Sequence, residues 1–400
     1  MDFRQYLAAL RSQPIPKEMA FPEAEYRCRI AKLRSHMAER GLDALLVTEV
    51  SNVSYLSGFE TFVPNNFACL TLSGEGEPTL QVAEFEIPGA LLNSWVGDVR
   101  ATRFNDPDAT AGEFAAILQQ HGLDGKRIGL ETRLNGFTID LYERLKRALP
   151  SARFSDASDL VFRVRLVKSP RELALMGKAA NIVRPALAET LASITAGMTE
   201  NDIAAVAYAA LARGGSEYFS CQPCVMAAHR AGWIHTSQRG MRIEAGQTAM
   251  MEMGAFCHRY VAAVMHTVAV GDPAPAVMRL TEAAHRTLEL VEQAVRPGRS
   301  AHDAAREIKR GLDPVREEAY STGMFGYAVG LSFPPTWREG SFMIAEGVEQ
   351  TFEPGMTFLT PVTLRHPGML GVGFTDTFVV TERGCEALTA RDRSLKIVGI

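Results

Sequence analysis

Residues 235–267 read HTSQRGMRIEAGQTAMMEMGAFCHRYVAAVMHT, and this stretch is rich in side chains that transfer protons. Four of the nine histidines lie in it or just before it: His229, His235, His258 and His266. Glu252 stands among apolar neighbours, where an unpaired charge is costly. Burial raises the pKa of a carboxyl, which then becomes an acid or base useful near neutral pH. The alternative is a structural glutamate paired with Arg242 or Arg259.

The chain before this stretch alternates helix and strand signals. Tyr26, Ile30, Leu33 and Met37 repeat at helical spacing, and residues 44–47 are typical of a short buried strand. Residues 69–72 and 79–82 predict two strands joined by a turn rich in glycine and glutamate. These signals continue to about residue 165, so we predict an α/β layer domain over residues 1–165.

A second domain is predicted from residue 166 to residue 400. Ser169, Pro170 and Glu172 are typical of a helix start, and the helix is expected to run to about Ile194. Thr199 opens another helix that Gly214 closes, and long helices are expected over residues 276–295 and from Ser300 to about residue 311. Strands fill the intervening segments. Helices separated from hairpins indicate an α+β domain, so the whole chain is assigned to the α+β class.

Composition limits the functions that this chain can have. It has 400 residues, 46% of them hydrophobic, and a formal net charge of −4, so no basic surface is expected to recruit nucleic acid. The longest apolar run, residues 203–212, is too short to span a bilayer, and residues 1–5 do not resemble a secretory signal. Six scattered cysteines, with one CxxC at Cys221 and Cys224, favour a reducing cytoplasm and structural thiols.

The spacing of these motifs resembles the creatinase/prolidase/methionine-aminopeptidase superfamily, whose catalytic domain has the pita-bread fold. The segments that carry the resemblance are His235, Glu252-Met253-Gly254, Arg259-Tyr260, Thr267 and Glu353-Pro354-Gly355-Met356. Residues 26–58 resemble the N-terminal domain of creatinases and prolidases, and residues 168–172 resemble the usual entry into the catalytic domain. The resemblance covers nearly the whole chain.

Peptidases of this superfamily hold two metal ions with two aspartates, a histidine and two glutamates. The corresponding positions in this chain are Glu252, Ala263, Tyr327, a position near Thr360, and Thr375. Hard divalent ions need several oxygen or imidazole ligands that converge on one point, and this set does not supply them. The resemblance therefore implies an enzyme that uses no metal or other cofactor.

Creatinase, a member of this superfamily, hydrolyses a small non-peptide C–N bond without metal, and its catalytic histidine matches His235. A closer likeness is to the ectoine hydrolases, carried by residues 216–218, 227–232, 259–260 and 326–331. Val261 and His266 depart from that subgroup's pattern, which leaves the substrate open between ectoine, hydroxyectoine, creatine and related amides or amidines.

The resemblance implies a catalytic pair in a cytoplasmic hydrolase of C–N bonds. Glu252 is expected to act as nucleophile or base and His235 as proton shuttle. Six side chains are expected to contact the substrate: His229, Tyr260, His266, Tyr327, Asp376 and Phe62. Phe62 lies in a loop expected to reach the partner's site in a homodimer. The alternatives are an Xaa-Pro peptidase with a degenerate metal site, an inactive binding module, and a lyase.

Overall fold

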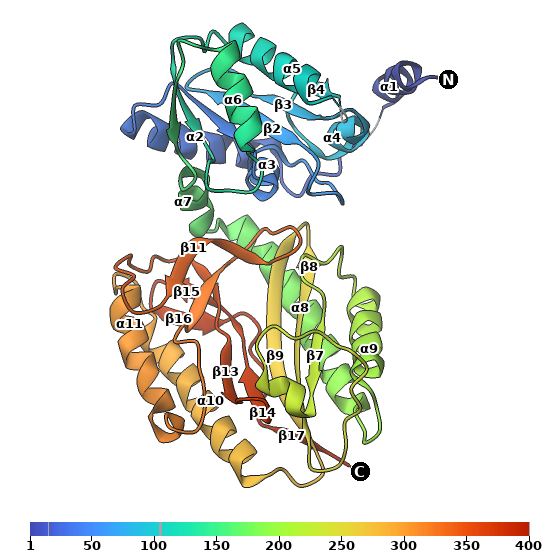
Figure 1. Ribbon diagram of the computed structural model, residues 1–400, viewed down its shortest axis with the longest axis vertical. Coiled ribbons are helices and arrows are strands. Elements are labelled where there is room, and N and C mark those ends of the chain that lie inside the picture. The colour runs from blue at the N-terminus through green and yellow to red at the C-terminus, as the bar shows by residue number, and fades with distance from the viewer. Residues whose placement is uncertain (15, 104–105, 400) are drawn as a thin grey trace. The chain divides into compact units, whose positions relative to one another are not determined.

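The computed structural model describes residues 1–14, 16–103 and 106–399, and the chain forms two compact units, Met1–Arg165 and Leu166–Ile400 (Figure 1). Each unit has its own sheets and covering helices. Within the described residues, no helix is both long and apolar enough to cross a membrane.

The N-terminal unit is built on one mixed six-stranded sheet in the order β4-β3-β2-β1-β5-β6. Its strands are β1 (Ala44–Val47), β2 (Ala68–Ser73), β3 (Thr79–Ala83), β4 (Asp98–Thr102), β5 (Arg127–Leu130) and β6 (Arg153–Asp156). β2 pairs antiparallel with both β1 and β3, whereas β4, β5 and β6 pair in parallel. The strands predicted at 44–47, 69–72 and 79–82 are confirmed.

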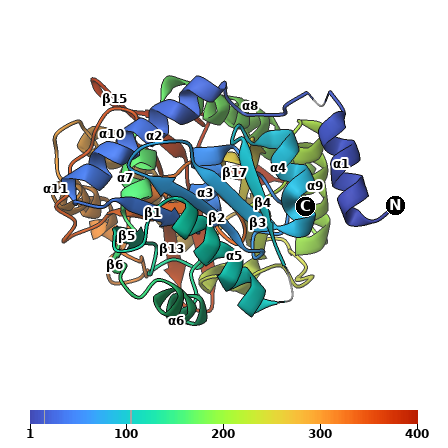
Figure 2. The same cartoon turned by 90° about the horizontal axis from the view of Figure 1, so that it is seen from above.

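Helices cover both faces of that sheet. The helices of the described N-terminal residues are α1 (Phe3–Ser12), α2 (Glu23–Glu39), α3 (Val50–Ser57), α4 (Ile87–Asn93), α5 (Pro107–Gln120), α6 (Ile139–Ala148) and α7 (Leu160–Leu166), with a 3-10 turn at Glu84–Glu86, and α1 contacts α4. Leu46 and Leu130 from the sheet pack with Phe114 of α5 and Leu145 of α6 in one buried cluster. Figure 2 shows α2 on the opposite side of the sheet from α6.

The C-terminal unit contains three sheets. One has the order β17-β9-β8-β7, another β11-β10-β12-β15-β16, and β13 pairs with β14 alone. Their strands are β7 (Cys224–Ala227), β8 (Thr248–Cys257), β9 (Tyr260–Val270), β10 (Gly326–Val329), β11 (Arg338–Ile344), β12 (Thr357–Leu359), β13 (Val362–His366), β14 (Leu370–Phe374), β15 (Thr377–Thr381), β16 (Gly384–Ala387) and β17 (Lys396–Val398). A two-residue turn, His258 and Arg259 with φ of 46° and 68°, joins β8 and β9 as a hairpin.

Three helices of this unit begin directly after a capping serine or threonine, namely α8 (Pro170–Ser193), α9 (Glu200–Arg213) and α11 (Ala301–Ile308). The unit also contains α10 (Pro275–Ala294), with 3-10 turns at Ala228–Gly232 (η2) and Lys309–Val315 (η3). Ser169 and Glu172 form a capping box at the start of α8, and Thr199 and Asp202 form one at the start of α9. The expected α+β class is therefore confirmed, with α8 packed on β8 and β9.

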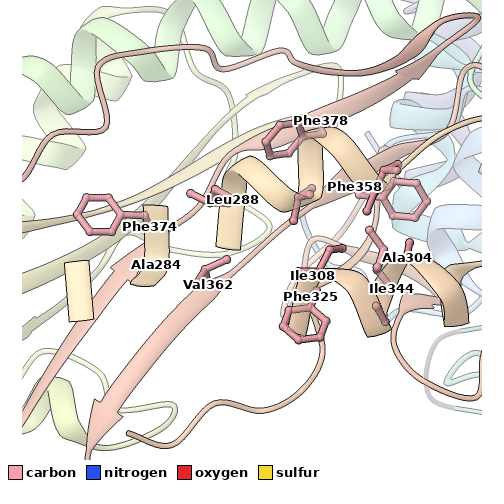
Figure 3. Packing of buried hydrophobic residues seen from close by; sticks show 14 of the residues in the cluster. Ala284, Leu288, Ala304, Ile308, Phe325, Ile344, Phe358, Val362, Phe374 and Phe378 are labelled. Atoms are coloured by element: carbon pink, nitrogen blue, oxygen red, sulfur yellow. The ribbon is translucent and has the colours of Figure 1, made fainter. Parts of the chain in front are cut away.

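The main core lies between helices α10 and α11 and the strands from β10 to β15. Figure 3 shows its interlocking side chains, among them Leu288, Ile308, Phe358 and Phe374. The sheets are also tied by polar contacts: the Thr267 hydroxyl of β9 donates to the Gly373 carbonyl (3.0 Å) and accepts from the Gly373 amide (2.8 Å). These ties hold the β13–β14 hairpin against the β8–β9 hairpin.

Candidate functional site

Glu252 is an acid of the C-terminal unit with a strongly raised pKa. It lies in β8, half-buried between neighbours that are fully buried, and it pairs in register with Cys224 of β7 and Met265 of β9. Burial raises its pKa to about 7, against an ordinary value of 4.5. In the described part of the chain the carboxyl forms no hydrogen bond or ion pair. Glu252 is therefore poised to exchange a proton near neutral pH.

The charge that faces Glu252 belongs to Arg365 in β13. Among the described residues, the charge of this arginine lowers the pKa of Glu252, and burial in turn lowers the pKa of Arg365. Arg259 instead stacks between Tyr218 and Phe333, 4.5 Å from each ring, and Arg242 donates to the Gly197 carbonyl. The arginine near Glu252 is thus Arg365, and not Arg259 or Arg242.

Two aromatic residues complete the neighbourhood of Glu252. Trp337 is buried against Gly254, which points to the same face of β8 as Glu252. A Cβ at Gly254 would lie 3.0 Å from Cζ3 of Trp337, so glycine is what lets the ring approach the strand. The Trp337 Nε1–H donates to the Tyr327 hydroxyl at 2.8 Å. Burial and the charge of Glu252 raise the pKa of Tyr327, which keeps the phenol protonated.

Cys221 and Cys224 lie on the other side of the acid. Burial raises the pKa of Cys221 to about 11 and that of Cys224 to about 12, and the charge of Glu252 adds to both shifts. Both residues are free thiols, and the Cys224 Sγ–H donates to the Thr236 carbonyl at 3.1 Å. These thiols are thus poor nucleophiles at neutral pH, in keeping with a structural role.

His235 and His229 both lie at the exposed edge of this region. His229 is part of η2, and His235 follows it in a turn, with a left-handed φ of 53°. The next residue, Thr236, is anchored to Cys224, and Cys224 pairs with Glu252. The backbone at His235 is thus held one strand away from Glu252, but the two side chains make no hydrogen bond with each other in the described structure.

Three residues expected to contact substrate are instead fully buried with internal partners. The Tyr260 hydroxyl donates to Glu172 (2.8 Å), and the His266 Nε2 lies 3.1 Å from the Ser394 carbonyl. Burial lowers the pKa of His266 to about 3, so this ring stays neutral. Asp376 accepts from Thr389 (2.8 Å) and from two arginines, Arg391 and Arg393. All three residues are fully buried and bonded within the unit, and their contact with substrate stays a prediction.

The positions that correspond to peptidase metal ligands do not form a metal site. Ala263 has no donor, and the Tyr327 hydroxyl is engaged by Trp337. The Thr360 hydroxyl donates to the Asp376 carbonyl (3.3 Å), and Thr375 is fully buried. Among the described residues, no three side chains of histidine, cysteine, aspartate or glutamate come together as a possible metal site. The donor set therefore does not fit a pair of divalent ions.

Phe62 lies in the N-terminal unit, in the loop between α3 and β2. Its ring is 75% exposed, whereas Phe59 in the same loop is buried. Glu86 fixes the loop by accepting hydrogen bonds from Thr61 (3.0 Å) and Asn66 (2.8 Å). The loop is thus ordered by its own unit and exposes a single aromatic side chain.

Sequence reasoning missed Arg365 and Trp337. A weak signal for Arg365 was present, because it follows Val362 and Leu364 in the short, largely buried strand β13. The sequence does not reveal that β13 comes to lie near β8, which carries Glu252. Trp337 follows a loop and carries no comparable signal.

Two family models match the chain. Metallopeptidase family M24 matches residues 174–382, and the creatinase/prolidase N-terminal domain matches residues 29–167. The ectoine hydrolase of Halomonas elongata is 28% identical over 401 residues, covering 95% of this chain and 99% of that protein. The Xaa-Pro dipeptidase of Pyrococcus furiosus is 26% identical over 376 residues, covering 92% of this chain and 99% of that protein.

Solved structures share the fold along the whole chain. A dipeptidase from Pyrococcus horikoshii OT3 superposes with a TM-score of 0.81 at 22% identity, covering 92% of this chain and all of that chain. A prolidase from Thermococcus sibiricus gives a TM-score of 0.83 at 21% identity, covering 93% and 99%. The C-terminal unit therefore has the pita-bread architecture, and the N-terminal unit has that of the creatinase-like domain.

Proposed function

The chain belongs to metallopeptidase family M24 and carries a creatinase/prolidase N-terminal domain, and from this premise we propose that it is a metal-independent hydrolase of a non-peptide C–N bond in a small amidine or amide. The relatives named above are hydrolases. The observation that carries the proposal is Glu252, a half-buried, unpaired carboxyl with a pKa of about 7 at the position of the family's first metal-binding aspartate.

The chemistry of the donor set supports a reaction without metal. Alanine, tyrosine and threonine at the other ligand positions leave Glu252 as one carboxylate, and a single carboxylate does not hold two divalent ions. A single carboxyl in a partly buried site is instead suited to acid–base or nucleophilic catalysis, because its protonation state changes near neutral pH. Each step of the proposed reaction therefore uses side chains alone.

The proposed reaction adds water to an sp² carbon bonded to nitrogen. Glu252 takes a proton from the attacking water, the C–O bond forms, and the C–N bond breaks as the nitrogen receives that proton. His235 carries the proton between Glu252 and the leaving nitrogen, since its loop is anchored beside β7. In a variant of this scheme, the Glu252 carboxylate attacks the carbon and the C–N bond breaks as His235 protonates the leaving nitrogen. Water then hydrolyses the covalent intermediate, which releases the Glu252 carboxylate.

Tyr327 and His229 are proposed to orient the substrate. Tyr327 keeps its phenolic proton and adjoins Trp337, so it offers a hydrogen-bond donor on an aromatic wall. His229 lies at the exposed edge in η2, where it can meet a polar part of the substrate. An apolar wall with a few fixed polar groups is the usual composition of a small-molecule site.

The experiment incubates the purified protein with ectoine, hydroxyectoine, creatine and a Xaa-Pro dipeptide, and follows products by mass spectrometry. We expect hydrolysis of one of the first three, unchanged by EDTA, and no cleavage of the dipeptide. The variants His235→Ala and Glu252→Gln should each lose about 10²–10⁴-fold in kcat. Glu244→Gln, which changes an exposed glutamate, is the matched control.

Other outcomes of this experiment point to specific alternatives. Dipeptide cleavage that EDTA abolishes and metal restores would identify a peptidase. Absence of turnover on every compound would favour a binding module. If both folded variants keep more than about a tenth of wild-type turnover, the assignment of the catalytic pair is wrong.

A further inference from the structure

Arg365 is a buried cation whose hydrogen-bonding capacity is only partly used. Its residue is 6% exposed, and Nη1 donates to the Thr363 hydroxyl at 2.7 Å. Nε is buried and, in the described part of the chain, has no partner. Buried guanidinium groups are normally matched by acceptors, because the desolvation of an unmatched charged donor is costly. An unmatched donor here calls for an acceptor that the chain does not supply.

The backbone holds Arg365 in a fixed position. Its amide and carbonyl both bond to Tyr320, at 3.1 and 2.8 Å. Its register partner in β14 is Gly371, where a Cβ would lie 2.1 Å from the carbonyl oxygen of Ala231, so the hairpin packs directly on η2. Tight backbone packing of this kind fixes the position of the Cα atom of Arg365. A guanidinium on such a rigid strand holds its N–H donors in a defined orientation.

Arg365 and Glu252 influence each other by charge, yet they form no contact ion pair. Each shifts the pKa of the other toward its charged form, and their nitrogen and oxygen atoms are not within 4.0 Å. A site with a cation at one end and a carboxylate at the other favours a ligand of the opposite polarity. Such a ligand is a zwitterion with its anionic group at Arg365 and its nitrogen-bearing group at Glu252.

We infer that Arg365 is a specificity-determining residue that binds the carboxylate of a small zwitterionic substrate. The planar guanidinium offers parallel N–H donors that match the two oxygens of a carboxylate. This inference rests on the proposed function for the location of the reacting bond, but the recognition of the carboxylate is measurable without turnover. It narrows the substrate class from small amides and amidines to those that carry a carboxylate.

The test measures binding by isothermal titration calorimetry with ectoine, creatine, and the carboxamide of each. Wild-type protein should bind at least one acid roughly 10- to 100-fold more tightly than its carboxamide, because a hydrogen bond to a charged group is lost in the amide. Arg365→Gln should bind acid and amide with Kd values within about twofold of each other. Arg365→Lys should keep part of the preference for the acid, since lysine keeps the positive charge but lacks the two parallel N–H donors of the guanidinium.

A matched control and an independent readout keep the test decisive. Arg242→Gln, which changes an exposed arginine whose side chain donates to the Gly197 carbonyl, should retain the wild-type preference. If Arg365→Gln does not fold, Arg365→Lys and the wild-type comparison of acid with amide still decide. Equal affinity for acid and amide in wild type, or binding of none of the four compounds, overturns the inference. Binding with the expected preference but without hydrolysis would instead contradict only the proposed function.

Discussion

Replacing Glu252 by glutamine should stabilise the protein at alkaline pH and change its stability little at acidic pH. The reason is linkage between protonation and folding. Between the unfolded pKa of about 4.5 and the folded pKa of about 7, the native state holds a proton that the unfolded state has released. The wild type therefore loses stability as pH rises through this window, and the full penalty is present above pH 7. Glutamine carries no such penalty.

The magnitude follows from the size of the pKa difference. At 1.36 kcal/mol per unit, a pKa raised from 4.5 to about 7 corresponds to about 3 kcal/mol. Glu252 keeps part of its surface exposed, and water screening reduces the effect. We expect the difference in unfolding free energy between Glu252→Gln and wild type to increase by about 2 kcal/mol, in favour of the variant, from pH 5 to pH 8.5.

Urea unfolding followed by tryptophan fluorescence measures this difference, because Trp233 and Trp337 lie in the same unit as Glu252. Wild type, Glu252→Gln and the exposed control Glu244→Gln are compared at pH 5 and pH 8.5. Other groups whose protonation differs between the folded and unfolded states in this range, such as His266, cancel in the comparison. If the advantage of Glu252→Gln is the same within about 0.5 kcal/mol at both pH values, the carboxyl titrates as an exposed one and the burial argument fails.

Three further outcomes are expected. The kcat/KM of the wild type should rise with pH to a plateau above about 7, because Glu252 acts in its ionised form; a pH–rate profile that falls across this range would assign it as an acid instead. Asp376→Asn should lower the free energy of unfolding by about 3–5 kcal/mol, since it leaves Arg391 and Arg393 without their buried counter-charge; an unchanged urea midpoint would contradict this. The protein should be a homodimer by light scattering, with Phe62 closing the partner's site, so Phe62→Ala should reduce turnover while leaving the thermal midpoint unchanged; a fully active monomer would refute it.

The sequence was most informative where the signal is local. Ser169 and Glu172 mark the start of α8 because a capping box satisfies backbone donors within four residues of each other. Residues 44–47 form a buried strand, as their short run of apolar residues between polar segments predicts. Glu252 was identified for a similar reason: a carboxyl inside an apolar strand needs either a partner or a function.

Only the tertiary structure decided which groups meet. Tyr260 and His266 lie in β9, and Asp376 lies between β14 and β15. The sequence does not reveal that Glu172, Ser394 and the Arg391–Arg393 pair already bond to them. Arg365 faces Glu252 because the β13–β14 hairpin packs on η2 and β9, through contacts between segments far apart in the chain. The sequence indicates that a buried charge needs a compensating group. Which residue supplies that group depends on strand pairing and packing, and therefore on the whole fold.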